Sequence, residues 1–263
     1  MTRLLSALVL AAPILVVLFF TSSVVFLCVV LLLVYRAGWE FQTLINLCGW
    51  RVRAWEGALD ACAFVLALWV GGVLPALVMA IIVLRVFLKA FSRETFRESL
   101  SLTSVSLLGV TWVGGAGGLI VLIRAFPDGV EAIFFLFVVV WANDIAAMFT
   151  GKTLGERKLA PKISPGKTVE GAIGGIIAGI FVGVLTTFYM DVPGVDPWLA
   201  IPVSVCIGLF ALIGDLGESI LKRAAGEKDA SDIIPGHGGL LDRIDGLLVA
   251  GPAFYCYLYW VRF

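Results

Sequence analysis

Long apolar runs alternate with short polar segments along this chain, and the pattern predicts membrane-spanning helices rather than a soluble core. Most of the runs are close to the ~20 residues that an α-helix needs to cross the hydrocarbon of a bilayer. Only Gly71, Gly72 and Pro75 separate the third run from the fourth. We expect nine spans, near 4–20, 22–36, 60–72, 73–90, 103–124, 130–150, 169–190, 197–216 and 245–261. The predicted fold class is therefore all-α, a polytopic integral membrane protein.

The basic residues are distributed unevenly between the segments that join these spans. If the N-terminus is cytoplasmic, every Lys and Arg except Arg124 and Arg262 lies on the cytoplasmic side or at a cytoplasmic span end. Such asymmetry is what the positive-inside rule predicts. The polar loops 151–168 and 217–244 would then face the cytoplasm, where nucleotides are found. The first apolar run, which follows Arg3, could instead be a signal peptide, although no small-residue cleavage site stands out.

Residues 37–59 are rich in tryptophan and contain two arginines, Arg51 and Arg53. The segment could lie flat at the membrane interface as an amphipathic stretch. It could equally be an ordinary aromatic belt around the ends of two spans.

Composition supports a membrane protein and argues against nucleic-acid binding. The 263 residues are 60% hydrophobic and 14% charged, whereas a soluble domain is about half apolar and about a quarter charged. The net charge is zero, so no global field would attract nucleic acid. The five cysteines form no C-x-x-C pair, and we expect them to act as small buried hydrophobes. They are Cys28, Cys48, Cys62, Cys206 and Cys256.

Residues 214–246 form a polar island between two apolar runs, and charge near a bilayer is costly, by about 2.5–3.5 kcal/mol on insertion scales. Within it, Asp215, Ser219, Lys222 and Arg223 have the spacing of one helical stripe if the helix continues past the membrane face. Asp242 and Asp245 are three residues apart at the start of the last run, so they would share a helical face. Carboxylates beside basic side chains suit a hard cation such as Mg²⁺ with a phosphate ligand.

The only histidine, His237, lies between two glycines of the island. It could be a general base or a phosphate donor. It could equally be a turn residue that hydrogen-bonds the backbone.

The second polar loop follows Asp144, which is embedded in an apolar run and is a functional candidate for that reason. The loop carries the turn sequence Ser164-Pro-Gly-Lys167-Thr168, whose hydroxyls and ammonium could bind a phosphate. Its glycine spacing is not that of a P-loop. Alternatively, the basic side chains attract anionic lipid head groups. These are Lys152, Arg157, Lys158, Lys162 and Lys167.

Several of these residues together resemble the signature of the phosphatidate cytidylyltransferases, or CDP-diacylglycerol synthases. The resemblance covers residues 144–246. It rests on Ser219-x-x-Lys222-Arg223, Lys228-Asp229, Pro235-Gly-His237-Gly-Gly239 and Asp242-Arg243-x-Asp245. A second motif of that family is similar to Ser164-Pro-x-Lys167-Thr168-x-Glu170-Gly171.

The resemblance implies that CTP and phosphatidate give CDP-diacylglycerol and pyrophosphate at the cytoplasmic face of an inner-membrane homodimer. Together with the apolar runs, we expect N-terminal transmembrane helices with an interfacial segment over 1–100 and a C-terminal transmembrane catalytic region over 101–263. Mg²⁺ would be held by Asp215 and Asp242, with Asp245 as a further candidate and a K⁺ ion beside it. Lys222 and Arg223 would act in catalysis. The expected substrate-binding residues are Asp144, Ser164, Lys167, Thr168, Glu170, Ser219, Lys228, His237 and Arg243.

Two alternatives remain open from the sequence. A CTP-dependent polyprenol or phytol kinase is also a membrane enzyme with a cytoplasmic nucleotide site, but it transfers the γ-phosphoryl group. A secondary transporter would fit glycine-rich spans such as 171–183 together with membrane-embedded acids. The glycines are explained more simply by close helix packing.

Overall fold

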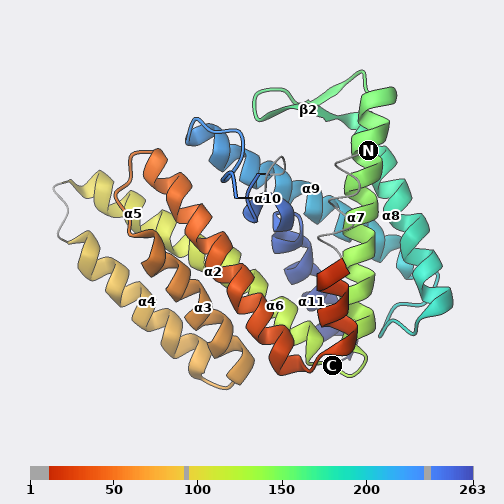
Figure 1. Cartoon of the computed structure of the whole chain (residues 1–263), viewed down its shortest axis with the longest axis horizontal. Coiled ribbons are helices and arrows are strands. Elements are labelled where there is room, and N and C mark those ends of the chain that lie inside the picture. The colour runs from red at the N-terminus through yellow and green to blue at the C-terminus, as the bar shows by residue number, and fades with distance from the viewer. Residues whose placement is uncertain (1–11, 92–94, 234–237, 263) are drawn as a thin grey trace. The chain divides into compact units, whose positions relative to one another are not determined.

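The computed structural model describes residues 12–91, 95–233 and 238–262, and this part of the chain is mostly helical (Figure 1). Two compact units divide it. Unit 1 is built from Ser22–Leu122 and Leu221–Ile244, and unit 2 from Ala7–Thr21, Ile123–Ile220 and Asp245–Phe263. Residues 12–20 are helical. The following elements are α2 (Ser23–Leu47), α3 (Ala54–Val70), α4 (Leu74–Ala90), α5 (Phe96–Gly109), the π-helical turn η1 (Val110–Gly115), α6 (Ala116–Arg124), α7 (Gly129–Thr153), β1 (Lys158–Ala160), β2 (Ser164–Thr168), α8 (Val169–Tyr189), α9 (Ala200–Ala224), α10 (Leu241–Ile244) and α11 (Leu247–Arg262).

Six helical segments in the described part of the chain are long and apolar enough to cross a membrane, which indicates a multi-pass membrane protein. The predicted count of nine spans stays a prediction. Residues 4–11 of the first predicted span lie outside the described residues, and α3 and α4 have only 17 residues each. The six segments are Ser23–Leu47, Phe96–Ala125, Gly129–Thr153, Val169–Tyr189, Ala200–Ala224 and Leu241–Val261.

The predicted break between the third and fourth runs is confirmed. Gly71 and Gly72 both have positive φ, at 80° and 63°, a region that glycine enters without steric cost. Pro75 lies in the first turn of α4, where its missing N–H removes no helical hydrogen bond. These residues let the chain reverse between α3 and α4.

The segment 37–59 forms no separate element of its own, and its placement at the membrane interface stays a prediction. Residues 37–47 continue α2, residues 54–59 begin α3, and only 48–53 connect them. Arg36 and Glu40, one turn apart within α2, form an ion pair at 3.0 Å, which a continuous helix allows. A Cβ added at Gly38 would lie 3.1 Å from the Ala58 Cα, so α2 and α3 pack closely here.

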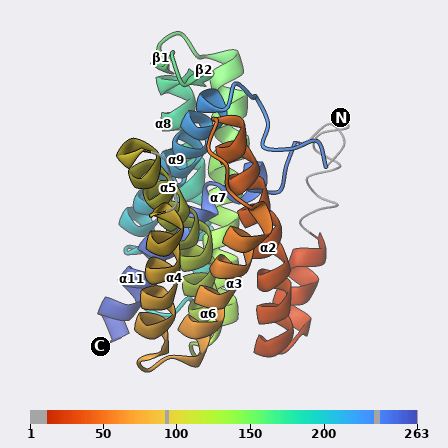
Figure 2. The ribbon, with the colours of Figure 1, turned by 90° about the vertical axis from the view of Figure 1, so that its left-hand side faces the viewer.

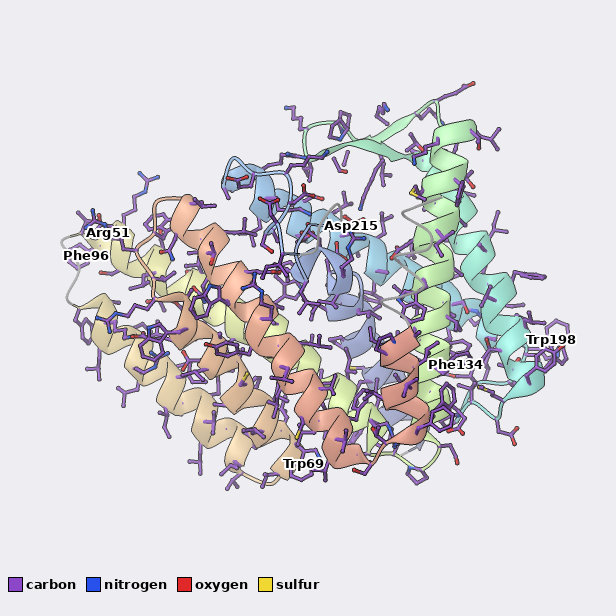
Figure 3. The ribbon with its side chains drawn as sticks, in the orientation of Figure 1. Arg51, Trp69, Phe96, Phe134, Trp198 and Asp215 are labelled. Atoms are coloured by element: carbon purple, nitrogen blue, oxygen red, sulfur yellow. The ribbon has the colours of Figure 1, made fainter. Side chains whose placement is uncertain are left out.

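In unit 1, helices α2 to α5 lie side by side (Figures 1 and 2). Ile82, Val86 and Val110 form a buried apolar cluster, against which Phe64 and Leu107 pack. In Figure 3, Arg51, just before α3, and Trp69, near its last turn, lie at opposite ends of that helix, and Phe96 lies near Arg51. Aromatic residues thus occur at both ends, as is common where helices meet the two interfaces of a bilayer.

Charged side chains also join α3 to α4. Glu56 contacts Arg85 and Lys89, and Asp60 contacts Arg85. These groups line a cavity of about 290 Å³ that also includes Gln42. Because the acids and bases pair with one another, the charges inside unit 1 are largely compensated.

In unit 2, α7 and α8 pack along a face of buried glycines (Figure 1). A Cβ added at Gly175 would lie 2.7 Å from the Asn143 carbonyl oxygen, so only glycine allows this approach. On the other face of α8, Ile177 and Phe181 are 61% and 68% exposed, as expected for side chains in contact with lipid. Close helix packing therefore accounts for the glycine-rich run.

Two findings depart from the sequence-based expectations. The loop 151–168 contains the antiparallel hairpin β1–β2, so the fold is not purely helical. The expectation of buried cysteines is wrong for Cys28, Cys206 and Cys256, which are exposed on apolar helices. On a membrane helix the exposed face meets lipid, where a small apolar side chain is well tolerated.

Candidate active site

Helix α9 carries the first group of predicted site residues. Because it continues to Ala224, Asp215, Ser219, Lys222 and Arg223 lie on one helix, as expected (Asp215 is labelled in Figure 3). Ser219 and Lys222 are buried, whereas the Asp215 side chain is 40% exposed. The stripe therefore presents both buried and accessible polar groups.

Arg223 turns away from this stripe. It is exposed, and its Nη1 donates to the Glu227 carbonyl oxygen at 3.0 Å. Glu227 lies beyond Ala224, the last residue of α9, so this hydrogen bond joins the helix end to the chain that follows it. Lys228 follows and is also exposed. Arg223 therefore makes a structural contact, and its predicted catalytic role stays a prediction.

Asp242 of unit 1 contacts one lysine and two backbone N–H groups. Its Oδ1 pairs with Lys222 Nζ at 2.5 Å. Its Oδ2 accepts from the backbone N–H groups of Ala230 and Gly239 at 2.8 and 2.7 Å. Hydrogen bonds to an ionised carboxylate are stronger than neutral ones. Asp242 therefore fixes the segment around it as well as pairing with Lys222.

Asp245 does not share this environment. Helix α10 ends at Ile244, and Asp245 lies in the turn before α11, so the expectation that Asp242 and Asp245 share one helical face is wrong. Asp245 Oδ1 accepts from Gly246 N–H at 2.7 Å. Within unit 2, its carboxylate is repelled by the negative charges of Asp215, Glu218 and Asp144. The structure therefore gathers acids from α7, α9 and the α10–α11 turn.

Lys167 of β2 contacts one of these acids. Its Nζ lies 2.5 Å from Asp215 Oδ2, and its side chain is only 18% exposed. Within unit 2, an ion pair thus attaches the hairpin to α9. This contact brings together residues 48 positions apart in sequence, which the separate motifs alone did not establish.

The neighbours of Lys167 hold the hairpin in place. The Thr168 hydroxyl caps α8 by accepting from Gly171 N–H at 3.1 Å. Glu170 accepts from the N–H groups of Glu156 and Arg157, both at 3.1 Å, and from Arg157 Nε at 2.8 Å. Ser164 pairs with Ala160 in the hairpin register. Thr168 and Glu170, expected to bind substrate, therefore also orient the hairpin that presents Lys167.

The acids suit a divalent cation, although no preformed ligand set is present in the described part of the chain. In this structure Asp215 and Asp242 each pair with a lysine instead. Burial and the nearby acids of unit 2 disfavour a negative charge on Asp245, and a bound cation that prefers oxygen ligands would offset this effect. The donor set therefore fits Mg²⁺ by its chemistry.

Some predicted residues are placed less directly. His237 lies outside the described residues. Arg243 is exposed and follows Asp242 in α10. Asp144, near the middle of α7, is exposed and lies close enough to Asp245 for their charges to interact.

Two acids of the site region were not predicted. Glu218 is fully buried one turn after Asp215, and its spacing of three residues could have identified it. Glu40 of α2 is 1% exposed and contacts the segment that holds Asp242. No local sequence pattern near Glu40 predicts this contact, because the partners in that segment lie about 200 residues further along the chain.

Comparison with known proteins gives a consistent result. A protein of Brucella suis biovar 1 named phosphatidate cytidylyltransferase is 46% identical over 131 residues, which cover 50% of this chain and 48% of that protein. The protein of that name from Haemophilus influenzae is 43% identical over 135 residues, covering 50% and 46%. The one from Staphylococcus haemolyticus is 36% identical over 186 residues, covering 70% and 69%.

The matched region thus spans about half the length of the Brucella and Haemophilus relatives and more than two thirds of the Staphylococcus protein. The match to the family as a whole is broader. It extends over residues 1–261 and includes every acid and lysine described above. The chain belongs to the cytidylyltransferase family.

Proposed function

We propose that this protein transfers the cytidylyl group of CTP to phosphatidate, giving CDP-diacylglycerol and pyrophosphate for phospholipid biosynthesis. The observation that carries this proposal is the pairing of signature acids with signature lysines, Asp242 with Lys222 and Asp215 with Lys167. Acids and lysines arranged in this way suit a nucleotide bound with a cation. The names of the relatives supply the substrate class.

In this reaction a phosphate oxygen of phosphatidate attacks the α-phosphorus of CTP. The new phosphorus–oxygen bond forms as the bond to the β-phosphate oxygen breaks, and pyrophosphate leaves with that electron pair. Such a transfer depends mainly on positioning and charge neutralisation. A phosphate monoester is largely deprotonated near neutral pH, since its second pKa is about 6. The reaction therefore needs no strong general base, and His237 is proposed to contact substrate rather than to move a proton.

We assign different roles to the two lysines, Lys222 and Lys167. Lys222, buried beside Asp242, would bind the charge that develops on pyrophosphate, together with Arg223 and Lys228. Lys167, held by the hairpin, would bind CTP or the lipid phosphate together with Ser164. Each lysine is already oriented by a carboxylate, which lowers the cost of positioning it.

We further propose Mg²⁺ as the cofactor, with a K⁺ ion beside it. Asp215 and Asp245, which interact within unit 2, would contribute oxygen ligands, and Asp242 is the ligand that the family resemblance adds. Bound Mg²⁺ supplies neutralisation of the nucleotide phosphates. The nine-span topology with a cytoplasmic N-terminus, the inner-membrane location with a cytoplasmic active site, and the homodimer belong to the same proposal.

The direct test uses purified protein in detergent with dioleoyl phosphatidate, CTP and Mg²⁺. We expect mass spectrometry to detect dioleoyl CDP-diacylglycerol together with an equal amount of pyrophosphate, and EDTA to stop the reaction. Absence of the lipid product from a folded, membrane-extracted protein would reject the proposed transfer. Product formation that continues in EDTA would reject the metal requirement alone.

A further inference from the structure

A carboxylate in the middle of α2 is almost completely buried. Glu40 is 1% exposed, and its oxygens accept from Leu241 N–H at 2.7 Å and from Leu240 N–H at 3.2 Å. They also accept from the Ser231 hydroxyl at 2.7 Å. Arg36, one helical turn earlier, pairs with Glu40 at 3.0 Å and reaches the same serine at 3.4 Å.

Burial of a charge is expensive unless it is paired and hydrogen-bonded. Glu40 meets both conditions, and its backbone and hydroxyl donors all come from the segment between α9 and α11. A neutral side chain at this position of α2 would avoid the desolvation cost altogether. The carboxylate instead holds that distant segment against α2 through these hydrogen bonds.

The segment that Glu40 holds is also the one that surrounds Asp242. Ala230 and Gly239 donate to Asp242 Oδ2, while their immediate neighbours Ser231 and Leu240 donate to Glu40. At each of these two places, one residue donates to Asp242 and the next residue along the chain donates to Glu40. A Cβ added at Gly239 would lie 2.7 Å from Glu40 Oε2, so the contact also requires glycine at that position.

We propose that Glu40 is a positioning residue for the reaction. Its contacts with Ser231, Leu240 and Leu241 orient the neighbouring donors to Asp242. Asp242 and Lys222 can then adopt the geometry of their 2.5 Å pair. The consequence for catalysis rests on the proposed function, whereas the consequence for the segment's structure does not. On this account the N-terminal helices take part in building the active site and are more than a membrane anchor.

The substitution Glu40→Gln tests this proposal with little change in shape. The amide offers one acceptor oxygen in place of two, and its NH₂ group would face a donor. Substitution of residues that orient metal or substrate ligands typically costs about 10–100-fold in activity. We expect kcat for CDP-diacylglycerol formation to fall by about that factor, with a smaller change in the KM for CTP.

Glu56→Gln is the matched control. Glu56 is also a largely buried glutamate of unit 1, but its partners are Arg53, Arg85 and Lys89. We expect this variant to keep kcat close to that of the wild type. Equal losses in both variants would mean that activity responds to general destabilisation of unit 1 and would overturn the proposal.

Hydrogen exchange provides a readout that does not depend on activity. The amides of Leu240 and Leu241 donate to Glu40, so peptides that contain them should exchange faster in Glu40→Gln than in the wild type or Glu56→Gln. Ser231→Ala, which removes one hydroxyl donor and no charge, should give a smaller increase and a smaller loss of kcat. Should Glu40→Gln fail to fold, this second variant still decides the question.

The possible failures are distinguishable. A wild-type protein that makes no CDP-diacylglycerol would reject the proposed function, while the exchange data would still test the placement of the segment. Unchanged exchange at Leu240 and Leu241, or a Glu40→Gln variant with wild-type kcat, would overturn the role of Glu40.

Discussion

At the scale of single residues, two lysines neutralise the acids of the proposed site. Lys222 pairs with Asp242 in a largely buried position, and Lys167 pairs with the more accessible Asp215. Removal of one partner from a buried pair leaves an uncompensated charge, which usually costs more than the pair itself contributes. Substitution of either the acid or the base should therefore lower stability.

For Asp242→Asn we expect loss of turnover with retention of fold and membrane insertion. Asparagine is similar in size, and its oxygen can still accept from Ala230 or Gly239, but it cannot balance the charge of Lys222. The measurement is CDP-diacylglycerol formation alongside gel filtration in detergent. Asp196→Asn is a suitable control, because Asp196 accepts from Trp198 and Leu199 N–H at the start of α9, where asparagine also caps well. Wild-type activity of Asp242→Asn would remove this acid from the site.

Lys222→Ala should lower kcat/KM by ~10² or more, the size of effect seen when a charge-stabilising contact in the transition state is lost. The exposed Lys162 in the hairpin turn provides the comparison, and Lys162→Ala should have little effect. Steady-state kinetics with varied CTP would measure both. A negligible effect of Lys222→Ala would identify it as a structural partner of Asp242 only.

Individual elements show which features a sequence can predict. Helix α8 occupies Val169–Tyr189, close to the predicted 169–190, because an apolar run and a capping threonine are both local signals. The hairpin β1–β2 was missed, since its strands have three and five residues and no apolar alternation. The contact of Glu40 with Leu241 was missed for another reason, as partners so distant in sequence leave no periodic pattern.

The packing of α7 on α8 gives a test at this scale. Gly175→Ala places a Cβ 2.7 Å from Asn143 backbone and side-chain oxygens, and overpacking of this kind typically costs about 1–3 kcal/mol. One turn later, a Cβ at Gly179 would meet Val139 at an ordinary 3.5 Å. Gly179→Ala should therefore be neutral or gain up to about 1 kcal/mol from helix propensity.

Thermal unfolding in detergent would compare the two variants. We expect a lower Tm for Gly175→Ala and an unchanged or higher Tm for Gly179→Ala. Equal Tm values would show that the α7–α8 interface is looser than the structure indicates.

Across the whole molecule, hydropathy predicts the six long apolar helices of the described residues, and the signature predicts the family to which the chain belongs. The pairing of acids with lysines could not be predicted, because Asp215 and Lys167 are joined by tertiary structure alone. The orientation in the membrane remains a prediction that rests on the distribution of Lys and Arg.

That orientation can be measured from the two ends of α8. The hairpin residue Lys162 precedes the helix and Asp191 follows it, and both are exposed. In a background without the native cysteines, Lys162→Cys should react with an impermeant maleimide only from the cytoplasmic side. Asp191→Cys should react only from the opposite side. Labelling of both from one side would contradict the proposed topology.

The fate of the CTP phosphates distinguishes cytidylyl transfer from phosphoryl transfer. Parallel reactions would contain phosphatidate, Mg²⁺ and CTP labelled at either the α- or the γ-phosphate, with a prenyl alcohol reaction as the comparison. We expect α-label to enter the lipid and γ-label to appear in pyrophosphate. Transfer of γ-label to the alcohol, with no α-label in lipid, would contradict this expectation and identify the protein as a lipid kinase.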